Sequence, residues 1–204
     1  MRRALITGIT GQDGGYLAER LVAEGLLVHG IVRPGEELPT HLNGLGDSLV
    51  VREVELTDVA QLDEALRNAE PDEVYNLAGV SSVALSWQEP VLTARVNGLA
   101  VAALLELLSR HQELTGRSIR FVQASSAEIF AGSTTSPQSE TTPLSPLSPY
   151  GASKAYAHHL VQVDRGRRLH PGPAPLPTHA RADLSSRSRT STSSDSRSRA
   201  SRSN

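Results

Sequence analysis

Short apolar runs alternate along this chain with longer segments in which apolar side chains recur every three or four positions. The runs occupy residues 4–7, 27–32, 49–54, 73–77 and 119–124. Most of them lack the strict apolar and polar alternation of a strand with one solvated face. This pattern favours strands that are buried on both sides in a parallel sheet.

Helical spacing fills the intervals between these runs. We expect helices at residues 16–24, 58–68, 90–110 and 150–163, and a loop at 125–149. Thr57 or Asp58 is a suitable N-cap for the second helix. The predicted apolar stripe of the third helix consists of Val96, Leu99, Ala103 and Leu107. The alternation of strand and helix predicts an α/β fold, a Rossmann-like doubly wound parallel sheet.

The composition changes after residue 164. Residues 1–164 carry 20 acidic side chains against 11 basic ones, whereas residues 165–204 carry nine arginines against two aspartates. The second part has three leucines and no other large apolar residue, so it cannot bury enough apolar surface to offset the entropy of ordering it. We expect a folded NADP-binding domain at 1–164 and a disordered Arg/Ser/Pro-rich tail at 165–204.

The absence of some residue types and patterns limits the kinds of site and the cellular compartment expected for the protein. No cysteine occurs, which excludes disulfides and thiolate metal sites, and no metal centre is expected. The sequence shows no apolar run near the length of a membrane span and no signal-peptide pattern. These features predict a soluble, cytoplasmic protein without a membrane partner.

Three glycines, Gly8, Gly11 and Gly14, follow the first apolar run. A Gly-x-x-Gly-x-x-Gly sequence between a strand and a helix places backbone N–H groups and a helix N-terminus where a pyrophosphate can bind. Gly8 would allow the tight turn, Gly11 the close approach of a phosphate, and Gly14 the packing of the helix near the strand. The alternative is a purely structural turn, and the flanking strand and helix favour dinucleotide binding.

The second apolar run ends in Arg33, and no acidic residue follows until Glu36. An acidic side chain at this point usually binds the 2′-hydroxyl of the NAD ribose, whereas an arginine suits the 2′-phosphate of NADP. The sequence therefore predicts NADP rather than NAD. The alternative is that Arg33 is a solvated surface residue.

The segment YGASK places Tyr150 and Lys154 four residues apart in the last predicted helix. At that spacing the two side chains share one helix face, where the ammonium favours the phenolate and lets Tyr150 act as a base or an acid. Lys154 is also the only lysine in the chain, and a compact charge that tunes a neighbour is a task for which arginine is less suited. The alternative is an accidental pair on an exposed helix.

Six segments together resemble the GDP-mannose 4,6-dehydratase family of the extended short-chain dehydrogenase/reductase superfamily. They are GITGQDG (8–14), YLAE (16–19), HGIVR (29–33), PDEVYNLAG (71–79), QASSAEIF (123–130) and SPYGASKAYAH (148–158). The resemblance covers residues 1–164. Its most specific elements are the Gln-Asp pair in the glycine loop and the Ser-x-Glu sequence after the fifth run.

The resemblance implies a hydro-lyase that converts GDP-mannose to GDP-4-keto-6-deoxymannose. NADP+ would take a hydride from C4 of the sugar, water would leave across C5 and C6, and the hydride would return at C6. Tyr150 would be the base for the C4 hydroxyl, and Lys154 would orient the nicotinamide ribose. Glu128 would remove the C5 proton, and Ser126 would hydrogen-bond near O4. The carboxylate of Glu128 separates a dehydratase from a sugar-nucleotide epimerase or reductase of the same superfamily, which is the alternative activity.

The resemblance also implies a set of cofactor contacts. These are Gly8, Thr10, Gly11, Gln12, Asp13 and Gly14 at the phosphates, Arg33 at the 2′-phosphate, Glu55 and Leu56 at the adenine, and Leu77, Ala78, Gly79, Ser81, Tyr150 and Lys154 at the nicotinamide half. Four positions depart from the family's pattern. They are Glu55 for the usual aspartate, Pro34 for a second arginine, Ser82 for a common histidine, and Ala131 as an additional residue.

The family's chain should continue into a further strand and a substrate domain, and residues 165–204 show the pattern of neither. We therefore expect a truncated or frame-shifted product, with GDP-mannose or a related nucleotide sugar as the partner that the resemblance implies. One alternative is a non-catalytic NADP-binding fragment. Another is nucleic-acid binding by the arginines of the tail, which the lack of interleaved aromatic residues disfavours. A homo-oligomer is compatible with the sequence.

Overall fold

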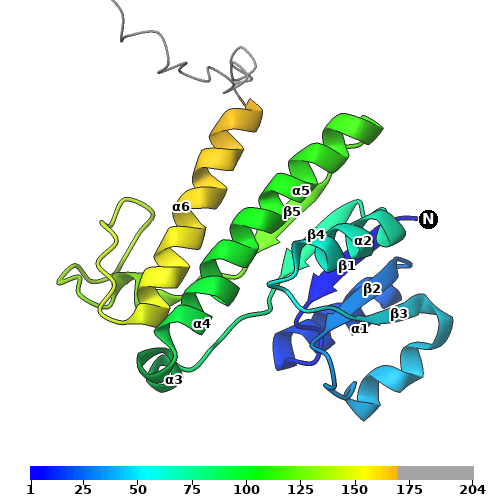
Figure 1. Ribbon diagram of the computed structural model, residues 1–204, viewed down its shortest axis with the longest axis horizontal. Coiled ribbons are helices and arrows are strands. Elements are labelled where there is room, and N and C mark those ends of the chain that lie inside the picture. The colour runs from blue at the N-terminus through cyan, green and yellow to red at the C-terminus, as the bar shows by residue number, and fades with distance from the viewer. Residues whose placement is uncertain (170–204) are drawn as a thin grey trace, which may run out of the picture. The chain divides into compact units, whose positions relative to one another are not determined.

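A computed structural model of the chain describes residues 1–169, which form a five-stranded parallel sheet flanked by helices (Figure 1). The strands are β1 (Arg3–Thr7), β2 (Leu27–Val32), β3 (Leu49–Glu53), β4 (Glu73–Asn76) and β5 (Arg120–Gln123). They lie in the order β3-β2-β1-β4-β5, and every neighbouring pair is parallel. The predicted Rossmann-like fold is confirmed, with each strand within one residue of its predicted ends.

The connections are mostly helical. The α-helices are α1 (Gln12–Ala23), α2 (Val59–Ala69), α3 (Val83–Gln88), α4 (Pro90–Ala94), α5 (Ala100–Thr115) and α6 (Pro149–Leu169). Shorter turns are the 3₁₀ segments η1 (Thr40–Ser48) and η3 (Ala127–Phe130) and the π turn η2 (Arg95–Leu99). The predicted boundary at residue 164 falls inside α6. The predicted disorder of the tail concerns residues that lie, from 170 onward, outside the described part of the chain.

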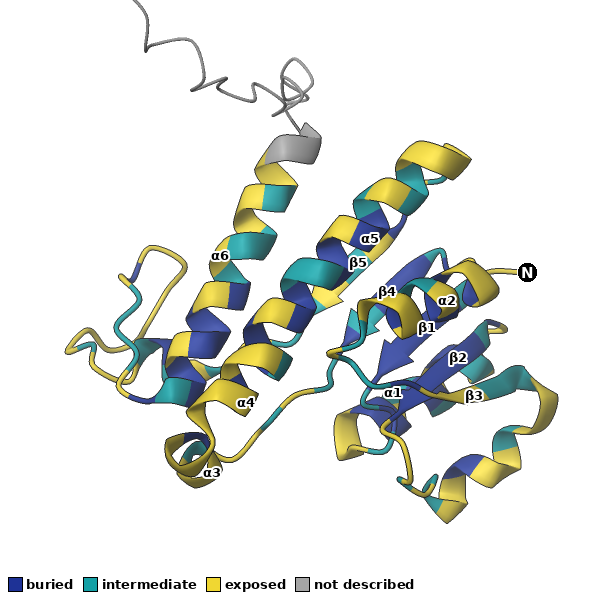
Figure 2. Cartoon of the chain, in the orientation of Figure 1, coloured by how far each residue is buried: buried dark blue, intermediate teal, exposed yellow. Residues whose placement is uncertain are grey.

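Apolar side chains from both faces of the sheet form the core. On one face, leucines and alanines of α2 and α5 pack against Leu5, Ile31 and Val74 of the strands. On the other face, α1 and η1 pack against Ala4, Ile6 and alternate residues of β2. Figure 2 shows the resulting buried centre in β1, β2 and β4. Helix α6 packs against α5 and β5 through Ala157.

The long helical segment departs from the predicted stripe. Leu99 is 56% exposed, and the buried face of α5 instead includes Val101, Leu104 and Leu108. The cause is the π turn η2, in which the N–H of Ala100 donates to the carbonyl of Arg95. A π turn adds one residue to a helical turn, so it shifts the face that every later residue presents. Within the predicted stripe Leu107 is buried and Val96 and Ala103 are partly buried, so the prediction is wrong at Leu99.

Within residues 1–169, one helical run is long and apolar enough to span a membrane. It extends from Pro90 to Thr115 and contains an 18-residue window of mean hydropathy 1.7, which differs from the expectation that no such run exists. Leu104, Leu107 and Leu108 of this run pack against the sheet and α2. Burial in the fold accounts for the apolar character of these positions.

The strand order creates a switch point between β1 and β4. From β1 the chain moves outward to β2 and β3, then returns to β4 on the opposite side and continues to β5. In open parallel sheets the crevice at the carboxyl ends of the strands at such a point is the usual ligand site. All the sequence-predicted site residues follow the carboxyl ends of strands or lie on the first turns of α1 and α6.

Candidate active site

The glycine loop joins β1 to α1 in a tight turn. Gly8 has φ +74°, and a Cβ there would lie 2.7 Å from the backbone nitrogen of Ala78. A Cβ on Gly14 would overlap the carbonyl oxygen of Gly8. Gly11, the N-cap of α1, has extended backbone angles, and its nearest protein neighbour to a built Cβ is 3.4 Å away. The fold therefore requires glycine at positions 8 and 14, whereas space for a ligand is the remaining reason for glycine at position 11.

The N-terminus of α1 faces this loop without a side-chain cap. Gln12 and Asp13 lie exposed in its first turn. Uncapped N–H groups at a helix N-terminus favour a bound anion.

The end of β2 lies beside the glycine loop, since the N–H of Gly8 donates to the carbonyl of Ile31 at 3.2 Å. Arg33 follows β2 with an exposed side chain, and its Nε lies 3.6 Å from Oε2 of Glu36. Oε1 of the same carboxylate accepts a hydrogen bond of 2.9 Å from the hydroxyl of Thr10. Glu36 thus connects Arg33, which is predicted to bind the 2′-phosphate, to Thr10 in the glycine loop.

The predicted adenine residues follow β3. Glu55 Oε1 accepts from both the backbone N–H and the hydroxyl of Thr57, at 3.1 and 2.9 Å. Leu56 is partly buried and packs against the α2 side of the core. Asp58, not Thr57, caps α2 by accepting from the N–H groups of residues 60 and 61.

The segment after β4 is held on both sides. The N–H of Ala78 donates to the hydroxyl of Thr7 at 3.2 Å, and that of Leu77 donates to the Thr7 carbonyl. Asn97 of η2 forms two hydrogen bonds with the backbone of Val80, one to its carbonyl at 2.9 Å and one from its N–H at 2.8 Å. These contacts fix the chain at Gly79, beside the glycine loop, while Ser81 is exposed.

The start of α6 is set by its local sequence. The hydroxyl of Ser148 accepts from the N–H of Gly151 at 3.0 Å, and Pro149 begins the helix. Both residue types suit these positions, because serine caps the first turn and proline needs no partner for a missing N–H. This start brings Tyr150 and Lys154 to the carboxyl edge of the sheet.

Tyr150 and Lys154 are both buried, at 9% and 6% exposure. The ammonium lies 5.9 Å from the centre of the Tyr150 ring and donates to the carbonyl of Ala124 at 3.2 Å. Burial lowers the pKa of Lys154 below its ordinary value. A Cβ built on Gly79 would lie 3.7 Å from the ammonium, so the Tyr/Lys pair adjoins the segment after β4. The alternative of an accidental pair on an exposed helix does not fit this burial.

Ser126 and Glu128 lie opposite the start of α6. Ser126 caps η3 by accepting from the N–H of Glu128 at 3.2 Å. Its hydroxyl hydrogen remains free to donate to another group. The Glu128 carboxylate is partly exposed and has no hydrogen-bond or ion-pair partner among residues 1–169. A Cβ on Gly151 would lie 2.7 Å from the Glu128 carbonyl, so glycine lets α6 approach η3 closely.

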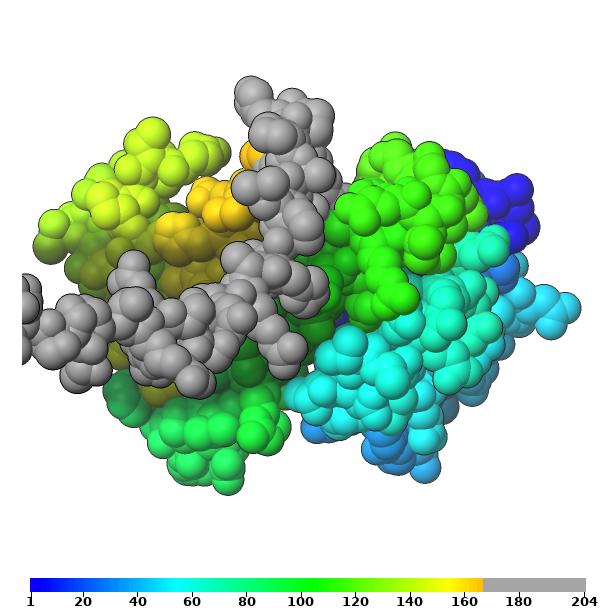
Figure 3. Space-filling view, turned by 45° about the horizontal axis from the view of Figure 1, so that its top comes forward, coloured from blue at the N-terminus to red at the C-terminus, as the bar shows by residue number. Residues whose placement is uncertain are grey.

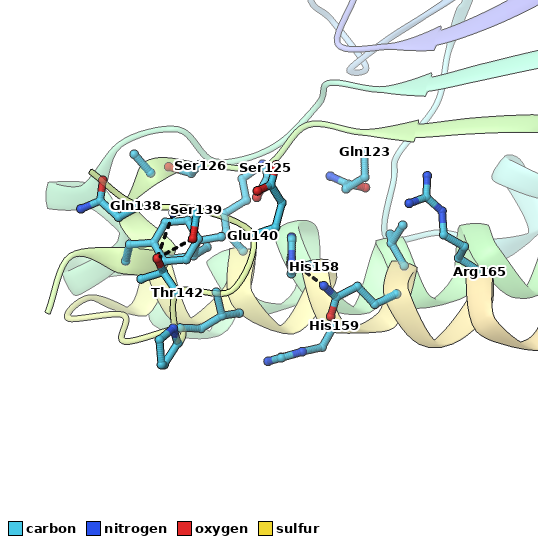
Figure 4. A pocket seen from close by; sticks show the side chains of 18 of the residues that line it. Gln123, Ser125, Ser126, Gln138, Ser139, Glu140, Thr142, His158, His159 and Arg165 are labelled. Carbon is cyan, nitrogen blue, oxygen red and sulfur yellow. Dashed lines mark hydrogen bonds between the residues drawn. The ribbon is translucent and has the colours of Figure 1, made fainter. Parts of the chain in front are cut away.

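A cavity of about 1120 Å³ lies between β5, the loop after η3 and α6. In Figure 4, Gln123 comes from β5, and His158 and Arg165 come from α6. Figure 3 shows the loop, in yellow-green, beside α6 on the surface. Ser126 and Lys154 lie in its wall, whereas the glycine loop does not. The cavity therefore adjoins the Ser/Lys end of the candidate site and is separate from the glycine loop.

Two residues of this site were missed by the sequence reasoning. Asn97 falls inside the helix predicted at 90–110 and has no role predicted from the sequence, although a polar residue next to Gly98 in such an apolar helix indicates a local irregularity. No contact between Glu36 and Arg33 is predicted from the sequence, although the intervening Pro34-Gly35 pair is a strong turn signal.

This sheet order, with a glycine turn after β1 and a buried Tyr/Lys pair beside the segment after β4, is the arrangement of Rossmann-like dinucleotide-binding proteins. Residues 5–167 match the family model for GDP-mannose 4,6 dehydratase, and the chain belongs to that family. The predicted resemblance is confirmed.

Relatives of known name agree with this membership. The chain is 44% identical over 164 residues to GDP-mannose 4,6 dehydratase 2 of Arabidopsis thaliana, covering 76% of this chain and 44% of that protein. It is 40% identical over 172 residues to a GDP-mannose 4,6-dehydratase of Vibrio cholerae, covering 78% and 45%. It is 39% identical over 170 residues to GDP-mannose 4,6 dehydratase of Homo sapiens, covering 78% and 44%. The chain therefore spans less than half the length of these relatives.

Solved structures of similar fold include two nucleotide-sugar enzymes. UDP-glucose 4-epimerase of Thermus thermophilus, in complex with NAD, has a TM-score of 0.66 and 30% identity, covering 79% of this chain and 50% of that one. TunA, an NAD-dependent NDP-hexosamine 5,6-dehydratase, has a TM-score of 0.66 and 28% identity, covering 82% and 50%. Both similarities extend over most of this chain and half of the other.

Proposed function

We propose that this chain carries the cofactor-binding and catalytic residues of an NADP-dependent nucleotide-sugar 4,6-dehydratase, a hydro-lyase acting on GDP-mannose or a related nucleotide sugar. Family membership supports the reaction class, and the Arabidopsis, Vibrio and human relatives carry the GDP-mannose name. The solved relatives with NAD support a nicotinamide cofactor.

The glycine loop fits the pyrophosphate of such a cofactor. Gly11 leaves room beside the backbone, and the first N–H groups of α1 are uncapped by side chains. Arg33 would hold the 2′-phosphate, which favours NADP. Leu77, Ala78, Gly79 and Ser81 would line the nicotinamide half, and Leu56 and Glu55 would lie near the adenine. When bound, the nicotinamide supplies a hydride acceptor and donor.

The remaining chemistry is proton transfer by the chain's own residues. Tyr150 would take the proton of the sugar hydroxyl at C4, with the Lys154 ammonium stabilising the phenolate from the same helix face. Ser126 would donate its free hydroxyl hydrogen near O4. Glu128, whose carboxylate is unpartnered within the described chain, would take the C5 proton and assist departure of the 6-hydroxyl.

One observation carries the proposal. The only lysine of the chain is buried beside Tyr150, within reach of the segment after β4, on a helix whose first turn packs against the Glu128 turn. Burial of an ammonium group costs free energy unless the charge interacts favourably with a neighbouring group. The titratable group beside the Lys154 ammonium is the phenol of Tyr150. The first turn of α6, with Tyr150, and the turn that carries Glu128 thus pack together at the carboxyl edge of the sheet.

The test is incubation of the purified chain with GDP-mannose and NADP, with mass spectrometry to detect loss of one water molecule. The same reaction in deuterated water would record exchange at C5. We expect dehydration by the wild type, loss of at least about a hundredfold in rate for Glu128→Gln, and a similar loss for Tyr150→Phe. Glu64→Gln, at an exposed position of α2 away from the cavity, is the control. Equal rates for Glu128→Gln and the control would contradict the assigned role.

An epimerase or reductase activity is separated by the same experiment. Such a reaction needs no carboxylate at position 128, so Glu128→Gln would leave it intact. A non-catalytic NADP-binding role would give cofactor binding without any change in the nucleotide sugar. Nucleic-acid binding by the tail concerns residues that lie almost wholly outside the described part of the chain.

A further inference from the structure

The four residues Arg33 to Glu36 form a tight turn after β2. The N–H of Glu36 donates to the carbonyl of Arg33 at 3.0 Å, and Gly35 has φ +76°. Proline in the second position of a turn and glycine with positive φ in the third are the residues that a type II turn requires. The sequence RPGE therefore returns the Glu36 side chain to Arg33.

The Glu36 carboxylate is shared between two cofactor-facing residues. Oε1 accepts from the Thr10 hydroxyl at 2.9 Å, and Oε2 lies 3.6 Å from Arg33 Nε. The Glu36 side chain is 33% exposed, whereas that of Arg33 is 75% exposed. A group that binds Arg33 is therefore placed next to a carboxylate that the glycine loop holds in position.

A carboxylate in this place has opposite effects on the two nicotinamide dinucleotides. It repels a 2′-phosphate, which carries negative charge, and it competes for the Arg33 guanidinium. For a 2′-hydroxyl it supplies the hydrogen-bond acceptor that NAD sites use at the end of the second strand. The sequence places no acid directly after Arg33, but the turn supplies one three residues later.

We propose that Glu36 is a specificity-determining residue that weakens the preference for NADP and lets this site accept NAD as well. The inference rests on the proposed function, because it concerns the same cofactor crevice. Glu36 distinguishes this turn from one in which a second basic residue follows Arg33. In such a turn both basic side chains would favour the 2′-phosphate.

The neighbouring Glu37 offers a matched control. It is exposed and has no hydrogen-bond or ion-pair partner among the residues that the structure describes. Glu36→Gln and Glu37→Gln remove the same charge one position apart. The glutamine at position 36 keeps an oxygen that can accept from Thr10, so the loop contact is retained.

The experiment is calorimetric titration of the wild type and both variants with NADP and with NAD at one fixed ionic strength. We expect Glu36→Gln to change the ratio of the two dissociation constants about tenfold in favour of NADP. The variant removes a charged hydrogen bond from the NAD complex and removes a charge repulsion from the NADP complex. For Glu37→Gln we expect less than about a twofold change, since an exposed charge is screened.

Four outcomes overturn the inference: no measurable binding of NAD by the wild type, a Glu36→Gln ratio equal to that of the wild type, a ratio equal to that of Glu37→Gln, or a ratio shifted toward NAD. In each of these the wild type still binds NADP, so the proposed function stands. Failure of the wild type to bind either dinucleotide overturns the proposed function together with this inference. A melting curve of each unliganded variant shows that the fold is intact.

Discussion

At the scale of single residues, the three loop glycines differ in what requires them. A Cβ at Gly14 would overlap the Gly8 carbonyl oxygen, whereas one at Gly11 would meet only an ordinary contact at 3.4 Å. We predict that Gly14→Ala lowers the free energy of unfolding by more than about 2 kcal/mol. Gly11→Ala should change it by less than about 1 kcal/mol but weaken NADP binding at least about tenfold.

Urea denaturation and calorimetric titration of the two variants check this prediction. A Gly11→Ala variant that binds NADP as well as the wild type would show that no ligand approaches that backbone. A Gly14→Ala variant with unchanged stability would contradict the close helix-to-strand contact.

His29 is a second residue with a separable effect. It lies buried on β2, and neither ring nitrogen has a partner among the described residues. Burial, and then the charges of Arg52 and Arg3, lower its pKa below the ordinary 6.5. The unfolded chain binds the proton more readily than the folded one, so the stability from this group is complete above that value and is lost as the pH falls below it.

Replacement of this histidine tests the linkage. His29→Leu removes two unpartnered nitrogens, and we predict a gain of roughly 1 kcal/mol at neutral pH together with a flatter decline in stability below about pH 6.5. Urea denaturation at a series of pH values measures both. An identical slope in the wild type and the variant would assign the acid sensitivity to other groups.

At the scale of elements, the π turn before α5 both shifts the helix face and holds the loop after β4. Asn97 is buried, and both the oxygen and the nitrogen of its side-chain amide form hydrogen bonds with the Val80 backbone. Asn97→Ala removes both hydrogen bonds from the partly buried backbone of Val80, so we predict a loss of about 1–2 kcal/mol and weaker NADP binding. Asn97→Asp can accept from the Val80 N–H, but it can donate to the Val80 carbonyl only while its carboxyl group is protonated, so it should lose less stability at low pH than at high pH.

Thermal melting of both variants measures this effect. A loss of unfolding free energy below about 0.5 kcal/mol for Asn97→Ala would show that water hydrogen-bonds the Val80 backbone equally well. The Asn97 contact would then be unimportant for stability.

The elements also show which parts of the fold can be predicted from the sequence. All five strands were predicted within one residue, because each is a short apolar run. The expectation that the strands are buried on both faces holds for β1, β2 and β4 but is wrong for β3 and β5, which lie at the edges of the sheet and are largely exposed. The helix stripe around Leu99 failed, because the register shift of a π turn leaves no periodic signal. Segments such as η1 and α3 are too short for periodicity to reveal.

The same limit applies to the candidate site. Tyr150, Lys154 and the glycine loop were predicted from spacing, because strand and helix contexts position them directly. The placement of Glu36 on Arg33 depends on one turn, and that of Asn97 on a contact between segments 17 residues apart. The turn at Glu36 has a local signal in Pro34-Gly35, whereas the contact of Asn97 is tertiary and is not encoded in a local pattern.

At the scale of the whole molecule, the amino ends of the strands are tied by charge, at the edge opposite the candidate site. Buried Glu73 of β4 pairs with Arg2 and Arg120 and accepts from the Tyr75 hydroxyl at 2.6 Å. The Tyr75 hydrogen bond and then the two arginines lower the pKa of Glu73, although burial opposes them. Burial and then the same hydrogen bond raise the pKa of Tyr75 to about 12.

Removal of this charge should affect stability and leave binding unchanged. We predict that Glu73→Gln lowers the free energy of unfolding by about 1–2 kcal/mol at neutral pH. Because the folded pKa of Glu73 is depressed, this difference should fade as the pH falls below its ordinary value near 4.5 and through the lower folded value. Urea denaturation at several pH values measures the loss, and an NADP dissociation constant that also changed would contradict the separation of the two edges.

The central claim is that a nicotinamide dinucleotide binds at the carboxyl edge of this sheet. Amide hydrogen–deuterium exchange with and without NADP tests it most directly, because it locates the binding site along the chain. The account predicts slower exchange on NADP addition in residues 8–14, 77–81 and 150–154, and no change in α2. Unchanged exchange throughout, or protection confined to segments away from that edge, would contradict it.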